Sequence, residues 1–300
     1  MSIVKGNNDQ EPSQLLDRSD SRVTHTDGVA SSMRAFFESV RSGDLGSLPV
    51  VVGLVVIWTV FTIINPIFLS PNNLVNLLFD CATVGVISLG IVCVLMLGEI
   101  DLSVGSMSGV GSALLGVLWV NQGVPLFFAI GAALCVGAAI GVIYALLRTK
   151  MGMPSFVSTL AGLLALLGFQ LFLLGSTGSI NLPYGSEFVN FGQLMVMPDW
   201  VSHSFALIPG VVIFVMGVKA RNQRQQAKLS ASSFGRILFK AITITCALEI
   251  VVVYLNLGRG VPWMFGVFIL LVVIMDYALT RTKWGRSMFA VGGNAEAARR

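Results

Sequence analysis

The stretch from Ser42 to Leu147 contains neither Lys nor Arg, and this feature limits the possible folds more than any other. Apolar residues recur there in runs long enough to cross a bilayer. With 55% hydrophobic and 11% charged residues, the 300-residue chain has too little charge to cover the surface of a soluble domain. Both observations predict an all-α integral membrane protein, because a spanning helix satisfies its own backbone hydrogen bonds in lipid.

The apolar runs predict a polytopic bundle of about eight transmembrane helices. Asn-Pro, Asn-Gln-Gly and basic connectors separate the runs. Lys and Arg gather in alternate connectors, and the positive-inside rule places those connectors and the N-terminal tail in the cytoplasm. The predicted spans are 49–64, 74–97, a third helix ending near 119, 126–147, 156–174, 205–218, 237–257 and 263–279.

This pattern divides the chain into three parts. Residues 1–47 are polar and of mixed charge, and we expect a partly disordered cytoplasmic tail. Residues 48–290 form the transmembrane domain, and residues 291–300 begin a short cytoplasmic helix. Residues 175–204 form a long polar loop without Lys or Arg, which we expect on the outside as a binding surface.

Two carboxylates, Glu99 and Asp101, interrupt the apolar region among glycines and serines. Acidic residues at membrane depth are costly and are therefore functional candidates. Counting spans puts this pair at the inside face with no basic residue nearby. We therefore favour a break within the membrane, where irregular backbone lines a cavity or is buried in protein. The candidates for this break or for a solute pathway are Gly98, Glu99, Asp101, Ser103, Gly105 and Ser106.

Three roles are open for the two carboxylates. Asp101 could cap the third helix while Glu99 stays in water or bonds to the backbone. The pair could instead line a solute route. A proton relay is the third possibility, but the sequence offers no intramembrane Lys, Arg or His as its partner.

Nothing in the sequence indicates covalent or metal chemistry. Walker A, Rossmann and Ser/His/Asp patterns are absent, and the basic residues do not form a patch suited to nucleic acid. Glu249, well within the seventh span, is expected to pair or snorkel, as are two acids near helix ends. Four cysteines without metal-ligand spacing are interpreted as packing residues: Cys81, Cys93, Cys135 and Cys246.

The end of the chain is more specific. Gly292 and Gly293 permit a sharp turn, and Asn294 is a good N-cap. Ala295, Glu296, Ala297 and Ala298 then begin a helix whose face is nearly smooth. Such a helix is suited to lie in a groove of another protein, although it could also be an ordinary surface helix.

Three motifs in this order resemble the sugar permeases of ABC importers of the ribose and xylose type. The resemblance covers about 49–300, and the additional pair of spans at 205–257 is more similar to the xylose type. The motifs are GEIDLSVGS at Gly98–Ser106, MPSFVSTLAG at Met153–Gly162, and WGR at Trp284–Arg286 followed by AVGGNAEAA at Ala290–Ala298.

The resemblance implies a permease subunit in the bacterial inner membrane that imports xylose or another pentose by alternating access. ATP and Mg would bind to a separate ATPase subunit, on which Gly292–Ala298 would dock, and this chain would hold no cofactor or metal. A periplasmic sugar-binding protein would dock on the outside loops, and a second permease copy would complete a homodimer. Family members continue beyond the third motif, so the resemblance also implies a truncated chain that ends inside the coupling helix.

Two other functions are open. One is a secondary transporter in which Glu99 or Asp101 couples transport to a proton or cation. The other is a membrane protein without transport activity.

Overall fold

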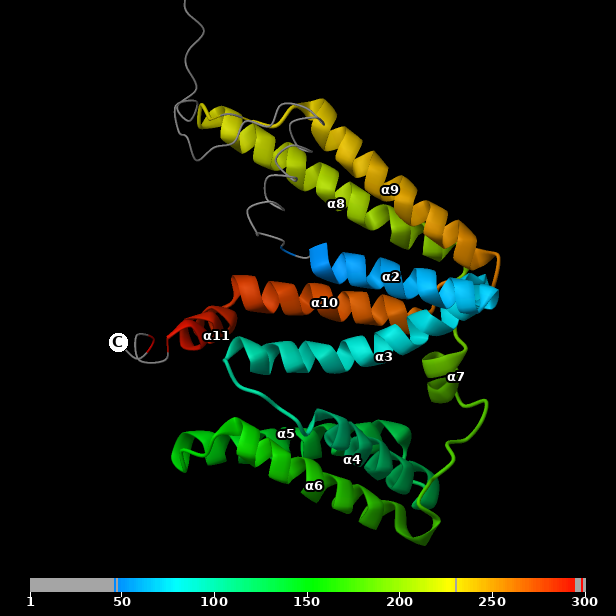
Figure 1. Ribbon diagram of the computed structural model, residues 1–300, viewed down its shortest axis with the longest axis vertical. Coiled ribbons are helices and arrows are strands. Elements are labelled where there is room, and N and C mark those ends of the chain that lie inside the picture. Colours follow the sequence, from blue (N-terminus) through cyan, green and yellow to red (C-terminus); the bar gives the residue numbers. More distant parts are fainter. Residues whose placement is uncertain (1–45, 47, 230, 295–297, 299–300) are drawn as a thin grey trace, which may run out of the picture. The chain divides into compact units, whose positions relative to one another are not determined.

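The computed structural model describes residues 46, 48–229, 231–294 and 298, and over these residues the chain is helical (Figure 1). Most of the predicted N-terminal tail and three residues of the predicted coupling helix, Ala295, Glu296 and Ala297, lie outside the described residues.

Seven of the described helices are long and apolar enough to cross a membrane, which confirms the predicted polytopic helical bundle. The first predicted span, α2 (Leu48–Ile64), is strongly apolar but shorter, at 17 residues. The seven are α3 (Pro71–Met96), α4 (Val104–Gly116) with its π-helical extension η2 (Val117–Asn121), α5 (Leu126–Lys150), α6 (Ser155–Leu174) with η3 (Gly175–Thr177), α8 (Asp199–Gln226), α9 (Phe234–Asn256) and α10 (Trp263–Arg281).

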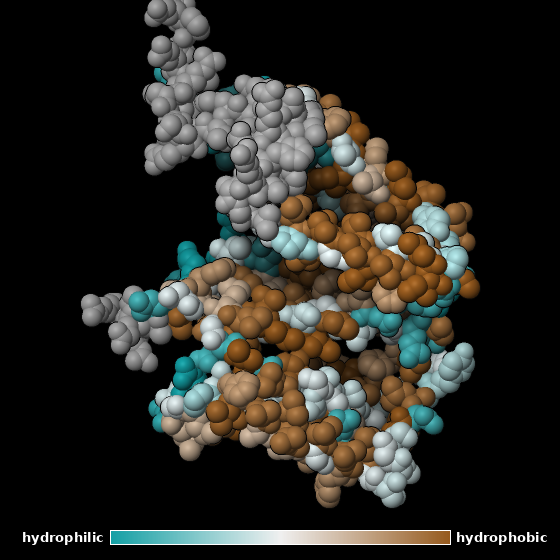
Figure 2. All heavy atoms as spheres, viewed as in Figure 1, coloured by the Kyte–Doolittle hydropathy of each residue, from teal (hydrophilic) through white to brown (hydrophobic). Residues whose placement is uncertain are grey.

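Large apolar side chains are exposed along the sides of these helices. Figure 2 shows brown, hydrophobic atoms over the helix sides and pale or teal, hydrophilic atoms mainly toward the ends. Phe127, Phe172 and Ile64 are each more than 70% exposed. A soluble protein would hide such side chains, whereas a lipid-facing surface requires them.

The chain forms two compact units. The first comprises the described residues up to Leu74 and those of Met197–Gly260. It holds α2, the short helix η1 (Pro66–Leu69) and the hairpin of α8 and α9, which run side by side (Figure 1). Glycines of α8 let the two helices approach, because a Cβ at Gly210 would overlap the hydroxyl of Thr245 on α9.

The second unit comprises Val75–Val196 and the residues from Val261. In it α4 packs against both α5 and α6. One residue of the small-residue side of α5, Gly137, faces the end of Met107 on α4, and Ala129 of the same helix is fully buried. Most of α3, all of α10 and the short helices α7 (Glu187–Gln193) and α11 (Lys283–Gly293) also belong to this unit.

The predicted outside loop is shorter and more ordered than its polarity indicates. It contains η3 and α7, and α8 already begins at Asp199 after Pro198. Beyond α7 the backbone N–H of Trp263 donates to the carbonyl of Met195 at 3.2 Å, which ties this segment to the start of α10. Polarity alone did not reveal α8's first turns, because Asp199, Ser202 and His203 are helical but hydrophilic.

Candidate functional site: a charged connector beside α11

The predicted break separates two helices, α3 and α4. Helix α3 ends at Met96, and α4 begins at Val104. Gly98 turns the chain with a φ of 74°, a left-handed conformation that glycine adopts without strain. The seven residues between the helices, 97–103, are hereafter called the connector. It meets the end of α5 that carries Arg148 and Lys150.

Asp101 holds the connector against the start of α4. Its Oδ1 accepts the backbone N–H of Ser103 at 2.8 Å and the hydroxyl of Ser103 at 2.7 Å. This is an Asx turn, in which the side chain fixes the backbone two residues on. Capping was one of the three roles left open for Asp101, and the carboxylate acts here through this turn rather than through a direct bond to the first turn of α4. Ser103 is the N-cap residue, is 1% exposed, and its carbonyl accepts the N–H of Met107.

Glu99 links three elements of the unit. Its Oε1 accepts from Nε of Arg148 at 2.6 Å, and its Oε2 accepts from the hydroxyl of Ser155 at 2.5 Å. Arg148 ends α5 and Ser155 begins α6. The expectation that no basic residue lies nearby was therefore wrong, since it considered only neighbours in the sequence.

The surroundings of Glu99 favour its ionised form. The hydroxyl of Ser155 lowers its pKa below the ordinary value of 4.5, partial burial opposes this, and the guanidinium of Arg148 lowers the pKa further. A carboxyl group with a lowered pKa stays charged at neutral pH and is poorly suited to carry a proton.

The start of α6 also contacts the backbone of the connector. The N–H of Ile100 donates to the Ser155 hydroxyl at 3.3 Å. The Thr159 hydroxyl lies 2.8 Å from the carbonyl of Ser155 on its own helix and 3.3 Å from the carbonyl of Ile100. Thr159 is 4% exposed. The second predicted motif, Met153–Gly162, thus supplies the hydrogen-bond partners of the first. Residue types gave no signal for this pairing, apart from Arg148 being the first basic residue after the long run without Lys or Arg.

The third predicted motif contacts the end of α3, next to the connector. A Cβ at Gly292 of α11 would overlap the carbonyl oxygen of Met96, so the backbones of α11 and the end of α3 approach closely. Gly292 and Gly293 are the last residues of α11 rather than a turn, and the chain becomes extended at Asn294 (φ −160°). Of the other candidates, Gly293 and Gly105 have open space at the Cβ position, and Ser106 donates to the carbonyl of Ser103 at 2.9 Å.

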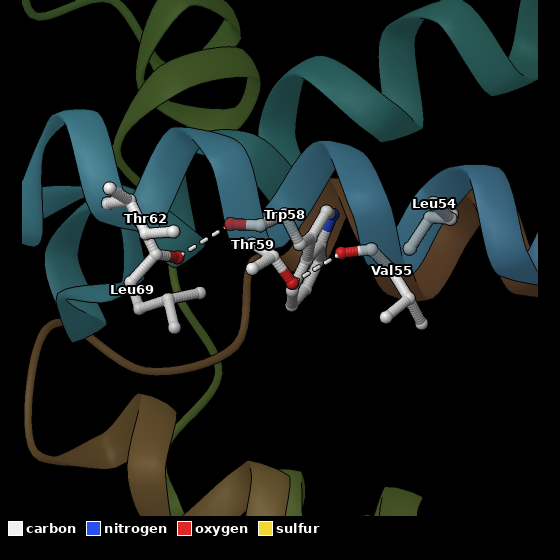
Figure 3. Close-up of a pocket in the computed structure, with 7 residues that line it drawn as sticks. Leu54, Val55, Trp58, Thr59, Thr62 and Leu69 are labelled. Atoms are coloured by element: carbon white, nitrogen blue, oxygen red, sulfur yellow. Dashed lines mark hydrogen bonds between the residues drawn. The ribbon is translucent and has the colours of Figure 1, made fainter.

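A groove on α2 is the contrasting case (Figure 3). It measures about 370 Å³ and is lined by apolar side chains with Thr59 and Thr62. Both hydroxyls donate to carbonyls one turn earlier on the same helix, Thr59 to Val55 at 2.8 Å and Thr62 to Trp58 at 2.7 Å (Figure 3). With its polar groups satisfied, this groove suits lipid and offers nothing to a polar solute.

Comparison with known proteins assigns the class. Residues 73–300 match the family described as branched-chain amino acid transport system / permease component. The chain therefore belongs to this permease family, and with its apolar helices it is a multi-pass membrane protein.

Individual relatives carry sugar names. The chain is 32% identical over 273 residues to the xylose transport system permease protein XylH of Escherichia coli K12, covering 88% of this chain and 66% of that protein. It is 28% identical to XylH of Haemophilus influenzae over 87% of this chain and 69% of the relative. The ribose import permease protein RbsC of Bacillus subtilis is 33% identical over 47% of this chain and 44% of its own length. No solved structure matches significantly.

Proposed function

We propose that this chain is the permease subunit of an ATP-driven importer for a monosaccharide, xylose or another pentose. The observation that carries the proposal is the similarity to xylose permeases over 88% of the chain, against 47% or less for the ribose permeases. The chain spans about two thirds of the length of those xylose permeases. The family description names branched-chain amino acids, so an amino acid is the substrate that a test has to exclude.

In this proposal, ATP hydrolysis in another subunit supplies the energy for transport. A separate ATPase would bind ATP and Mg and dock on Gly292–Ala298. The end of the second unit that carries Arg148, Lys150 and α11 would then be cytoplasmic, in agreement with the positive-inside rule. Arg281, Lys283 and Arg286 lie around the start of α11 and support this orientation. The N-terminus would be cytoplasmic too, in the inner membrane of a bacterium. A periplasmic sugar-binding protein and a second permease copy would complete the assembly.

The connector would couple α11 to the spans. Gly292 touches the end of α3, and Glu99 ties the next residues to α5 and α6. A displacement of α11 by the ATPase would therefore reach three spans through a short path. Glu99 and Asp101 hold a bend in this reading. A secondary transporter is less well supported, because the lowered pKa of Glu99 keeps that carboxylate charged.

Uptake in cells tests the proposal. An Escherichia coli strain without its own xylose uptake would express this chain with an ATPase subunit and binding protein of the xylose type, and labelled xylose and leucine would be compared. We expect xylose uptake that needs the ATPase and survives an uncoupler while ATP is maintained. Uptake that collapses with the proton gradient alone, or that prefers leucine, would contradict the proposal.

The contact with the ATPase has its own test. The double substitution Glu296→Arg with Ala297→Trp adds a charge reversal and a large ring to the predicted docking face. We expect it to abolish co-purification of the ATPase with the chain. Undiminished co-purification would place the contact elsewhere on the cytoplasmic side.

A further inference from the structure

A second hollow of the second unit lies between α4 and α6, toward the ends of these helices that face away from the connector. It measures about 310 Å³, at the lower end of the range of about 300–1,000 Å³ that is typical of small-molecule sites. Three parts of the chain line it: small residues of α4, the side chain of Gln170 on α6, and the segment after η3. The lining residues are Gly109, Ser112, Ala113, Gly116, Gln170, Leu174, Gly178, Ser179, Ile180 and Leu182.

Gln170 is the unusual residue in this cavity. Its amide carries two donors and an acceptor, yet it forms no hydrogen bond with the part of the chain that the structure describes. An amide in an apolar span needs partners, because lipid supplies none. A Cβ at Gly109 would overlap the Gln170 amide. The absence of a side chain there lets the amide lie against α4 and line the cavity.

Two hydroxyls complete the polar part of the lining. Ser112 donates to the carbonyl of Ser108 at 2.9 Å, which leaves its oxygen able to accept. The side chain of Ser179 makes no hydrogen bond among the described residues. The segment that carries Ser179 is itself held in place, because the Thr177 hydroxyl contacts the carbonyls of Leu174 and Ser179, each at 3.2 Å. The cavity therefore presents both donors and acceptors on a fixed frame.

The cavity carries no charge. All of its lining residues are described, and none is acidic or basic. A zwitterionic amino acid would lose the hydration of its ammonium and carboxylate groups there without a charged partner. A neutral polyhydroxy compound has matching donors and acceptors, and its C–H faces can pack on Ala113, Ile180 and Leu182.

We propose that this cavity is a binding site for a neutral monosaccharide, with the amide of Gln170 as its main polar contact. The inference deepens the proposed function and rests on it for the identity of the solute. The uncharged lining also favours a sugar, which the names of the relatives give, over the amino acid of the family description. In the proposed orientation the cavity lies toward the periplasmic side, where a binding protein would deliver its sugar.

The test measures binding to the chain alone in nanodiscs, without ATPase or binding protein. Saturation-transfer NMR detects weak sugar binding, with xylose and ribose as probes and leucine as competitor. We expect one of the two sugars to bind saturably and leucine not to displace it. Gln170→Leu should weaken binding about tenfold or more, because the substitution removes every hydrogen bond of the amide while keeping an apolar side chain in the span. Ser112→Ala should weaken it less.

Gln225→Leu is the matched control, since it makes the same change at an exposed amide far along α8 in the other unit. Unchanged thermal unfolding of Gln170→Leu shows that the variant is folded. Sugar binding by Gln170→Leu equal to the parent, displacement by leucine, or no sugar binding by the parent would overturn the inference. Intact, Gln170-dependent binding together with no ATP-driven uptake would overturn the proposed function alone.

Discussion

Two acid–base pairs of the same length stand in different settings. Glu99 and Arg148 are 2.6 Å apart at the ends of helices, where the connector meets α5. His203 and Glu249 are also 2.6 Å apart, but His203 lies in the first two turns of the spanning helix α8 and Glu249 lies inside α9. Glu249 lies seven residues before the end of α9 at Asn256, or roughly 10 Å along the helix axis.

The two pairs differ in what can replace a partner when the ion pair breaks. Half of the Arg148 side chain is exposed, and water or lipid headgroups can replace Glu99. Glu249 belongs to a helix long and apolar enough to span a membrane, where an unpaired carboxylate is costly. The Glu99–Arg148 pair is therefore expected to contribute less to stability than the His203–Glu249 pair, which joins the two helices of the hairpin. A neighbouring hydrogen bond also joins α8 to α9. The side-chain amide of Asn256 donates to the hydroxyl of Ser202, the residue before His203, at 3.1 Å.

Breaking the hairpin pair should have the largest effect. His203→Leu removes the partner of Glu249 and should destabilise the protein by about 2–3 kcal/mol, because a partly buried charge loses its compensation. Unfolding in detergent micelles, followed by circular dichroism, measures the change. The double substitution His203→Leu with Glu249→Leu should recover most of the loss, as apolar residues replace the pair. A single variant as stable as the parent would show that water already reaches Glu249.

The second prediction concerns the contact of α11 with the end of α3, beside the connector. Gly292→Ala should cost about 1–3 kcal/mol in the same assay, because its Cβ would meet the carbonyl oxygen of Met96, which is backbone and cannot rotate away. Gly90→Ala is the control: nothing lies within 4 Å of its Cβ position in α3, and alanine favours helix. Equal stability of the two variants would mean that α11 is not seated against α3.

The sequence predicts the helices better than it predicts the contacts between them. The spans follow from a local property, the length of apolar runs, and most of their ends follow from Asn, Pro and basic residues. The break after Leu97 was visible for the same reason. Pairings between distant residues have no local signature. Arg148 lies 49 residues from Glu99, and His203 was assigned to a loop because three polar residues begin α8.

The candidate site shows the same division. The three motifs were recognised singly, and nothing within them predicts that Ser155 donates to Glu99 or that Gly292 touches Met96. Gln170 was overlooked altogether, because one amide in an apolar helix is inconspicuous until the helix facing it is known. Its only local hint was polarity in a span.

The Asx turn of the connector should contribute less than either contact above. Asp101→Ala leaves the N–H of the buried Ser103 without its acceptor, and we expect a loss of about 1 kcal/mol. Asp101→Asn keeps an Oδ1 acceptor and should cost less. Hydrogen exchange measures the effect locally, with faster exchange at Ser103 in Asp101→Ala than in Asp101→Asn. Equal protection in both variants would show that the turn is held by the backbone alone.

The smallest effect is expected at Glu99, and its pH dependence identifies it. Because the folded-state pKa is lowered, the ionised carboxylate stabilises the fold at pH values above about 4.5, and this contribution is lost as the pH falls through the lowered pKa. Glu99→Gln should therefore be less stable than the parent at pH 7, by about 0.5–1 kcal/mol, since Arg148 is half exposed. The two unfolding curves should converge in acid. Ser155→Ala should move the convergence to higher pH, because the Ser155 hydroxyl is the main cause of the lowered pKa. A parent and Glu99→Gln variant that differ equally at all pH values would show that shape, rather than charge, joins the connector to α5 and α6.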